Sequence, residues 1–198
     1  MIQLYWSPRS RSFTCLWLME ETGLLYERVL TDIATGAQKA PEFLKINPMG
    51  KVPALKDGDV TLGEAAAICA YIADRYPETR LAPALTDPKR ARYLQWLFFA
   101  PSCVEPALIQ IFTKLEVPAS TAAWGSATQV FDVLDVELQK GPWILGEDFS
   151  AADLVVGSGL NYAVRLFKMV PSRPSFEAYI ARCVARPAFQ QAEKIAAG

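Results

Sequence analysis

The sequence divides into a first part in which strands and helices alternate and a second part without strand patterns. This division restricts the possible fold more than any other feature. Four short runs rich in strand-forming residues lie in the first part, at 2–5, 26–30, 52–55 and 60–62. Helical patterns fall between and after them, from Ser10 or Ser12 to Gly23, over 41–46 and over 64–75. The first part therefore predicts a small α/β domain at residues 1–77.

A proline-punctuated stretch at 76–88 reads as a linker between two domains. Every segment beyond it that shows a regular pattern is helical, namely 89–115, 121–139, 151–168, 175–185 and 188–196. Pro101 and Pro106 are expected to kink or break the first of these helices. The sequence thus predicts a second, all-helical domain at residues 88–198.

The chain contains no histidine, and this absence excludes several kinds of catalytic site. Without an imidazole there can be no Ser-His-Asp or Cys-His catalysis and no zinc site that uses histidine. The cysteines show no metal-ligand spacing, so we expect no bound metal and a reduced, cytoplasmic protein. They are Cys15, Cys69, Cys103 and Cys183, each expected to be a buried small hydrophobe.

The balance of charge and hydrophobicity narrows the range of partners. Lys and Arg number 20 and Asp and Glu 21, which gives a net charge of −1 and argues against nucleic acid as a partner. The 52% hydrophobic content is far from that of a disordered chain. No apolar run approaches the roughly 20 residues that a membrane-spanning helix needs, so no membrane partner is expected.

The segment Met49–Leu55 contains a proline, Pro53, near the start of a predicted strand. Proline cannot donate a ladder hydrogen bond, so its presence there needs a special reason. One reason is a cis bond between Val52 and Pro53, which would turn the Val52 backbone outward toward an extended, peptide-like ligand. The other is an ordinary position on an edge strand. The residues alone leave both readings open.

Gly63-Glu64-Ala65 opens a predicted helix and is a candidate anion site. Free backbone N–H groups and the positive end of the helix suit a carboxylate there, and Glu64 could pair with an ammonium group. The simpler interpretation is an acidic residue favoured in the first helical turn.

The stretch Ser7–Ser12 lies at the other junction of a strand with a helix. It holds two arginines, Arg9 and Arg11, and residues 1–19 contain no acidic residue. A hydroxyl at the start of a helix beside guanidinium groups could hold a thiolate. The simpler interpretation is that Ser12 caps the helix and the arginines are solvated.

A fourth motif, Phe149–Leu154, has a structural explanation. Ser150 and Asp153 have the spacing of a capping box, and Phe149 and Leu154 that of a hydrophobic staple. It is expected to build a core helix and to carry no chemistry.

Together, in this order and spacing, these motifs resemble the glutathione S-transferase family, with the active site of a bacterial, serine-type member. The resemblance covers nearly the whole chain. It is carried by residues 7–12, 41–48, 50–53, 64–77 and 149–153. It implies a thioredoxin-like N-terminal domain followed by an all-α helical-bundle domain. It also implies a cytoplasmic homodimer with a role in detoxification, which uses glutathione as co-substrate.

The resemblance also implies which residues bind glutathione. They are Gln38, Lys39, Lys51, Val52, Pro53, Glu64 and Ala65. The Val52 backbone, next to a cis-proline, would pair with the cysteinyl part. Glu64 and Ala65 would meet the γ-glutamyl end, and the first three residues would lie near the glycyl carboxylate.

For the glutathione sulfur, the resemblance points to Ser10 as the donor that stabilises the thiolate. Ser12 is the second candidate, because the register across Pro8 leaves a residue or two of freedom. Arg9 or Arg11 would add positive potential. Tyr5, one step before the position used by tyrosine-type members, is a weaker third candidate.

Cysteine-type bacterial members have a cysteine at the place of Arg11, so disulfide chemistry through an enzyme thiol is not expected here. An apolar electrophile would bind near Trp6, Arg9, Phe99, Ser102 and Leu108.

Two other functions stay open at this point. Family members commonly have serine at the place of Ala65, and this departure leaves room for a non-catalytic glutathione-binding or scaffold module. A glutathione-dependent isomerase or peroxidase on the same scaffold is the other alternative.

Overall fold

The computed structural model of the chain describes residues 1–197. These residues form two compact units, which are described separately. The first unit comprises residues 1–81 together with the chain from Ala185 onward, and the second comprises residues 82–184. Residue 198, the last of the expected helical domain, lies outside the described residues.

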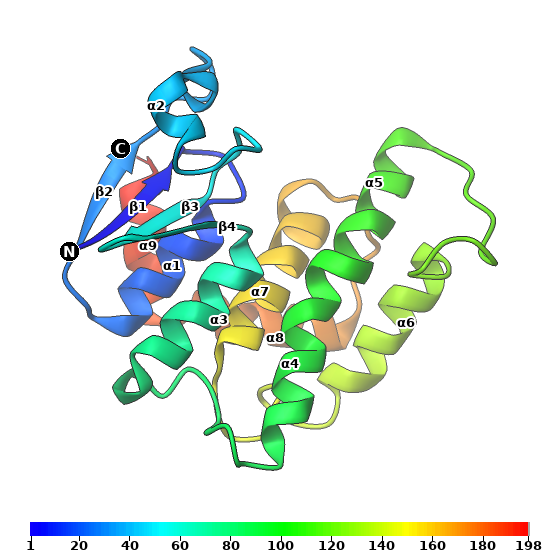
Figure 1. Cartoon of the computed structure of the whole chain (residues 1–198). Coiled ribbons are helices and arrows are strands. Elements are labelled where there is room, and N and C mark those ends of the chain that lie inside the picture. Colours follow the sequence, from blue (N-terminus) through cyan, green and yellow to red (C-terminus); the bar gives the residue numbers. More distant parts are fainter. Residues whose placement is uncertain (198) are drawn as a thin grey trace. The chain divides into compact units, whose positions relative to one another are not determined.

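The first unit is built on a mixed sheet, whose four strands in the described chain are β1 (Ile2–Trp6), β2 (Tyr26–Leu30), β3 (Ala54–Asp57) and β4 (Val60–Gly63). Their spatial order is β2-β1-β3-β4 (Figure 1). β1 runs parallel to β2 and antiparallel to β3. β3 and β4 form a β-hairpin, as Asp57-Gly58-Asp59 between two strand-forming runs predicts. Gly58, in its turn, has φ +60°, which glycine adopts without strain.

The sheet buries one face under helices because its side chains alternate. Ile2, Leu4 and Trp6 of β1 are buried. Helices α1 (Phe13–Thr22) and α3 (Ala65–Arg75) contribute most of the apolar side chains of this core. Tyr5 alternates to the other face, where its ring contacts Phe43 of the short helix α2 (Pro41–Leu44) edge to face, with 5.7 Å between ring centroids.

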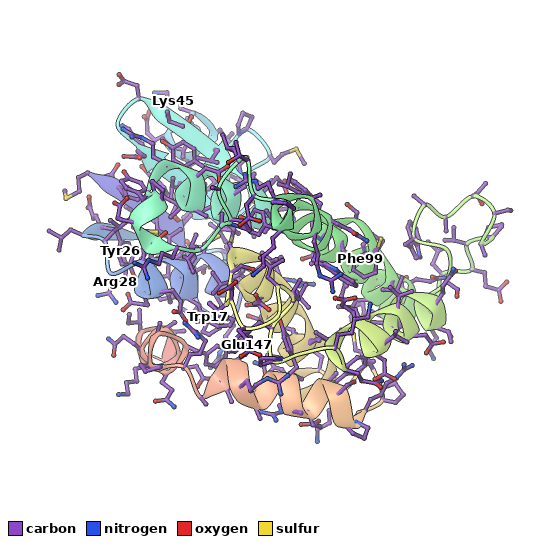
Figure 2. The ribbon with its side chains drawn as sticks, turned by 90° about the horizontal axis from the view of Figure 1, so that it is seen from below. Trp17, Tyr26, Arg28, Lys45, Phe99 and Glu147 are labelled. Atoms are coloured by element: carbon purple, nitrogen blue, oxygen red, sulfur yellow. The ribbon has the colours of Figure 1, made fainter. Side chains whose placement is uncertain are left out.

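The last helix, α9 (Pro187–Ala197), belongs to the first unit because it packs on α1 (Figure 1). Phe189 lies edge-on to Phe13 and Trp17, at centroid distances of 5.1 and 4.9 Å. Figure 2 shows Trp17 reaching from α1 toward α9. Arg186 also binds both carboxylate oxygens of Glu21, at 2.6 and 2.8 Å.

This packing differs from the expected grouping of residues 88–198. The apolar pattern identified the last helix but not its packing partner. The assignment of residues 1–77 and 88–198 to two domains stays a prediction.

The second unit is helical. Its helices are α4 (Lys89–Phe99), α5 (Glu105–Thr113), α6 (Ala127–Leu138), α7 (Ala151–Leu160) and α8 (Pro174–Val184). Two π-helical segments extend them, Ala100–Val104 between α4 and α5, and Asn161–Leu166 after α7. Pro101 therefore does not end the first helix, because the wider turn accommodates it. The predicted start at residue 121 is wrong, since α6 begins after Ser126, whose side chain caps it by accepting from Gln129 N at 3.2 Å.

The continuous helical stretch Lys89–Thr113 is 25 residues long and apolar enough, by length and composition, to cross a membrane. The sequence predicts no such span, because it contains no unbroken apolar run of roughly 20 residues. Core helices of soluble proteins meet the same criteria. The absence of a membrane partner stays a prediction.

The predicted capping box at the start of α7 is confirmed. Asp153 is fully buried and accepts hydrogen bonds from Ile144 N, Ser150 N, Ser150 Oγ and Tyr179 Oη, at 2.7–2.9 Å. Burial raises the pKa of Asp153, and these hydrogen bonds act in the opposite direction. The residue anchors α7, α8 and the 142–149 loop in the core of the second unit.

Candidate functional site

Because of the registers between the strands, the segments that follow β1, precede β3 and follow β4 lie at one edge of the first unit. Tyr5 pairs with Ala54, and Ala54 pairs with Gly63. Ser7, which follows β1, therefore lies at the same edge as Pro53, which precedes β3, and Glu64, which follows β4. This edge gathers the three motifs that the sequence singled out for chemistry.

The side chains of Ser10 and Ser12 form a hydrogen-bonded cluster with the backbone of Ser7 where β1 ends. Ser12 Oγ donates to Ser7 O at 2.9 Å and accepts from Ser7 N at 3.0 Å. Ser10 Oγ donates to the same carbonyl at 2.7 Å and lies 2.6 Å from Ser12 Oγ. Ser12 is fully buried, whereas Ser10 is partly exposed. The two candidate serines thus occupy different environments, and only Ser10 faces solvent.

Ser12 lies at the N-cap position of α1, as predicted, but the expected capping by its side chain is wrong. Its backbone is already helical, with φ −65° and ψ −15°, and its side chain makes no capping bond. The hydroxyl is directed back to Ser7 instead, so it secures the turn before α1. Arg9 in this turn is exposed and has φ +54°, and Arg11 is partly buried.

The hypothesis of a cis peptide bond between Val52 and Pro53 is confirmed. The alternative reading of Pro53 as an edge-strand proline is wrong, because β3 pairs with strands on both sides. Val52 is partly exposed and Pro53 is buried.

Glu64 immediately precedes α3 with φ +64°, a conformation that costs a non-glycine residue of the order of 1–3 kcal/mol. Such strained backbone is typical of ligand sites. The Glu64 side chain is exposed, and the backbone N–H groups of the first turn of α3, from Ala65, begin the helix beside it. This arrangement can bind a carboxylate and an adjacent ammonium group.

The residues expected near the glycyl carboxylate lie on two loops in close contact. Gly50 has φ +60°, and a Cβ there would come within 2.7 Å of Lys39 Nζ and 2.9 Å of Gln38 O. Lys39 Nζ also donates to Met49 O at 3.2 Å. Lys39 and Lys51 are exposed, and Gln38 Oε1 is buried without a hydrogen-bond partner among the described residues.

Asn47 is a structural part of this site that the sequence reasoning missed. It is buried, its Nδ2 donates to Lys51 O at 2.8 Å, and its Oδ1 accepts from Met49 N at 3.1 Å. A Cβ on Gly63 would come within 2.8 Å of Asn47 Nδ2. Asn47 therefore holds the 49–51 loop against the Gly63–Glu64 corner. The sequence shows only an asparagine before Pro48. It does not show that this asparagine is buried, so its structural role could not be predicted.

The residues expected to bind the electrophile are divided between the units. Trp6 is buried and Arg9 exposed in the first unit. In the second unit Phe99 is partly exposed on α4 (Figure 2), Ser102 is exposed and Leu108 is buried. The structure does not bring Tyr5 to the serine cluster, because its ring packs on Phe43.

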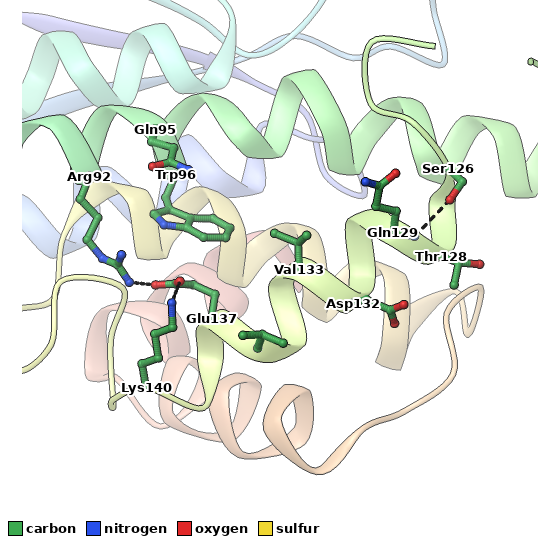
Figure 3. Close-up of a pocket in the computed structure, with 11 residues that line it drawn as sticks. Arg92, Gln95, Trp96, Ser126, Thr128, Gln129, Asp132, Val133, Glu137 and Lys140 are labelled. Carbon is green, nitrogen blue, oxygen red and sulfur yellow. Dashed lines mark hydrogen bonds and ion pairs between the residues drawn. The ribbon is translucent and has the colours of Figure 1, made fainter. Parts of the chain in front are cut away.

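The second unit has a cavity of about 650 Å³ between α4 and α6 (Figure 3). Trp96, Val133 and Val136 contribute apolar lining, and Trp96 Nε1 is buried without a hydrogen-bond partner among the described residues. At one end Glu137 is ion-paired with Arg92 and with Lys140. The sequence reasoning did not identify this cavity.

The cysteines offer no obvious nucleophile within residues 1–197. Cys15, Cys69 and Cys183 are buried, as predicted, and Cys103 is partly buried. Burial raises the pKa of Cys103, and it raises the pKa of Cys15 well above its ordinary value. A raised pKa disfavours the reactive thiolate.

A mixed sheet with a cis-proline before a central strand and helices on both faces defines the class of thioredoxin-like proteins. A model of the N-terminal domain of glutathione S-transferases matches residues 2–74. Glutathione S-transferase 3 of Zea mays is 33% identical over 209 residues, which cover 96% of this chain and 92% of the relative. The disulfide-bond oxidoreductase YfcG of Escherichia coli is 30% identical over 205 residues, which cover 97% and 94%.

Among solved structures, a sphingomonad glutathione S-transferase complexed with glutathione shares 32% identity with a TM-score of 0.82, and the match covers 98% of each chain. The chain therefore belongs to the glutathione S-transferase family. The predicted thioredoxin-like domain, helical domain and transferase class are confirmed.

Proposed function

We propose that this glutathione transferase stabilises the thiolate of glutathione with the hydroxyl of Ser10. The observation that carries the proposal is that Ser10 and Ser12 differ in burial and in their freedom to donate a hydrogen bond. Ser12 is buried and already donates to Ser7 O. When the Ser10 hydrogen turns from Ser7 O to a sulfur, that carbonyl keeps a donor. An unsatisfied buried acceptor would be costly. Rotation of the Ser10 hydroxyl does not create one, because Ser12 still donates to Ser7 O.

The rest of the sheet edge would hold the tripeptide. Its cysteinyl part would pair with the Val52 backbone, and its γ-glutamyl carboxylate would accept from the first N–H groups of α3 at Ala65. Glu64 would pair with the γ-glutamyl ammonium group. The glycyl carboxylate would lie between Lys39, Lys51 and Gln38, which the Gly50 turn brings near one another. The thiol proton would leave to solvent, and Arg9 or Arg11 would favour the anion.

Replacement of Ser10 tests this proposal. We expect Ser10→Ala to raise the pKa of bound glutathione by about one unit, since a hydrogen bond to a charged group is worth about 1.5–3 kcal/mol and one pKa unit about 1.4 kcal/mol. The thiolate absorbance is titrated in the binary complex. Turnover with a model aryl halide is expected to fall about tenfold or more, with little change in glutathione affinity.

Ser12→Ala and Ser120→Ala separate the alternatives. Ser12→Ala is expected to lower thermal stability, because Ser7 N–H loses its acceptor and Ser7 C=O loses one of its two donors. Ser120→Ala, in an exposed loop, serves as the neutral control. A normal thiolate signal in Ser10→Ala would disprove the role of Ser10. If only Ser12→Ala raised the thiol pKa, Ser12 would be the sulfur ligand.

We propose further that the protein is a homodimer that uses the cavity between α4 and α6. Val133 and Val136 are large apolar side chains that are exposed there, 44% and 60%, and acidic and basic side chains line the same cavity. A face with both signs of charge can match a second copy of itself across a twofold axis. Val136→Glu should shift the mass measured by light scattering from dimer to monomer, whereas Ser120→Glu, in an exposed loop outside the cavity lining, should not. An unchanged dimer would place the interface elsewhere.

Disulfide exchange is a second candidate function, because the relative YfcG is a disulfide-bond oxidoreductase. The cysteines of this chain are mostly buried, so the reaction would proceed through the thiolate of glutathione itself. A substrate panel decides among the alternatives. Turnover of a small disulfide, a hydroperoxide or a cis-dienoate identifies a reductase, peroxidase or isomerase, and binding to glutathione without any turnover identifies a scaffold module.

The apolar electrophile, the cytoplasmic location, the role in detoxification and the absence of metal and nucleic-acid partners also stay predictions.

A further inference from the structure

Within residues 1–197, five residues other than glycine have a positive φ. Three of them, Arg80, Lys114 and Lys168, lie at or just after the end of a helical segment, where a left-handed residue is common. Arg9 and Glu64 have no such explanation, because each precedes a helix. Both are charged, and both lie at the edge of the sheet that carries the serine cluster.

Arg9 occupies the second central position of the turn from Ser7 to Ser10. Pro8 is the first central residue, and Ser10 Oγ donates to Ser7 O across the turn at 2.7 Å. A positive φ after proline at this position usually selects glycine or asparagine. Arg9 adopts it with φ +54°. Since glycine would form this turn without strain, the backbone gives no reason for an arginine here, and strained residues are typical of ligand sites.

The side chain of Arg9 is available to a ligand. It is exposed, and no hydrogen bond or ion pair joins it to another side chain in the part of the chain that the structure describes. Residues 1–19 contain no acidic residue, so no neighbour in sequence neutralises it. Its guanidinium group therefore offers free donors one residue away from Ser10.

We infer that Arg9 selects electrophiles that carry an acidic group on an apolar body, an inference that rests on the proposed binding of the sulfur by Ser10. A guanidinium group binds a carboxylate or a sulfonate through two parallel hydrogen bonds. The electrophile would then be fixed at two points, with its reacting carbon at the sulfur and its acidic group at Arg9. A neutral electrophile of the same shape would have only the first of these contacts, so the site would discriminate against it.

An aryl chloride with an acidic group shows the reaction that this arrangement serves. The thiol proton of glutathione has left to solvent, and the sulfur attacks the ring carbon that carries chlorine. A C–S bond forms with an electron pair of the sulfur, the ring and its nitro groups take up the negative charge, and chloride then leaves with the electron pair of the C–Cl bond. The acidic group stays ionised throughout and serves only to position the ring.

The experiment compares two electrophiles that differ only in charge, 4-chloro-3,5-dinitrobenzoate and the neutral 4-chloro-3,5-dinitrobenzamide. The ratio of their kcat/KM values is measured with the full chain at saturating glutathione. We expect Arg9→Met to lower the ratio of benzoate to benzamide about five- to tenfold, because one hydrogen bond between charged groups is lost at an exposed position. Arg9→Lys should give an intermediate ratio, since it keeps the charge but not the paired donors.

Arg80→Met is the matched control. Arg80 is exposed and has nearly the same φ, +56°, but it lies beyond the far end of α3, so its replacement should leave the ratio unchanged. In the unmodified protein the ratio should also fall in about 0.5 M NaCl, because salt screens an exposed charge pair.

An unchanged ratio in Arg9→Met would overturn the inference. An equal fall with both electrophiles would also overturn it, since Arg9 would then act on the sulfur alone. Equilibrium binding of the two product conjugates, S-(4-carboxy-2,6-dinitrophenyl)glutathione and its carboxamide, gives the same comparison without turnover. If neither conjugate binds, the proposed glutathione site is wrong and the inference falls with it. If both bind and Arg9→Met leaves the ratio of their affinities unchanged, only the inference about Arg9 is wrong.

Discussion

Replacement of Asn47 should weaken glutathione binding without changing the rate of the chemical step. Its side chain makes two hydrogen bonds, to Lys51 O at 2.8 Å and from Met49 N at 3.1 Å, and packs on Gly63. A hydrogen bond contributes about 1 kcal/mol net, so Asn47→Ala should lower the free energy that favours the ordered 49–51 loop by about 2 kcal/mol. If binding must restore that order, glutathione affinity falls by up to about thirtyfold.

Isothermal titration of glutathione into Asn47→Ala measures this loss directly. At saturating glutathione, kcat and the thiol pKa should be unchanged, because Ser10 keeps its surroundings. Asn47→Asp retains the acceptor for Met49 N but loses the donor to Lys51 O, so its affinity should be intermediate. Asn161→Ala, in the second unit, is the control for loss of a partly buried asparagine.

The reasoning fails if Asn47→Ala lowers the melting temperature but binds glutathione normally. In that case Asn47 would stabilise the fold without ordering the loop that meets the ligand. A fall in kcat at saturating glutathione would also contradict it, since that result would mean that Asn47 influences the sulfur.

Three further predictions concern stability and pH. Asp153→Ala should lower the free energy of unfolding by about 4 kcal/mol in denaturant titrations, because it leaves four buried donors without their acceptor; a loss near zero would contradict the buried network. Hydrogen bonds from Ser175 and Arg173 lower the pKa of Asp135 in the folded protein. The ionised Asp135 therefore stabilises the fold above its unfolded pKa of about 4, and this stabilisation is lost as the pH falls through the folded-state pKa. Asp135→Asn should reduce the acid-induced loss of stability below about pH 4, as measured by denaturant titration at several pH values. Between about pH 6 and 9, kcat/KM should rise along one limb, that of the glutathione thiol, because the chain has no imidazole to titrate; a bell-shaped profile would show that another group takes part.

Local chemistry explains why much of the fold was predictable. The Asp57–Asp59 turn, the Gly23 helix end and the capping box at Ser150 each depend on residues close in sequence, and all three agree with the structure. The cis bond before Pro53 could be stated only as one of two readings. The sequence does not show that β3 lies in the middle of the sheet.

Predictions failed where two local hydrogen-bonding arrangements compete, or where a distant segment decides the role of a residue. Ser12 has a good N-cap side chain, yet it turns back to Ser7 because the end of β1 offers both a donor and an acceptor. Residues 121–126 have helix-forming spacing, but the capping bond of Ser126 sets the start of α6. The role of Asn47 could not be inferred, since it depends on the approach of Gly63 from another part of the chain.

The packing of α9 on α1 has a consequence for the order in which the chain is made. The first unit combines the beginning of the chain with its last helix, whereas residues 82–184 form a continuous stretch. During translation the helical unit can therefore complete its core while α1 still has Trp17 uncovered. Trp17 acquires its contact with Phe189 only after the last helix has left the ribosome.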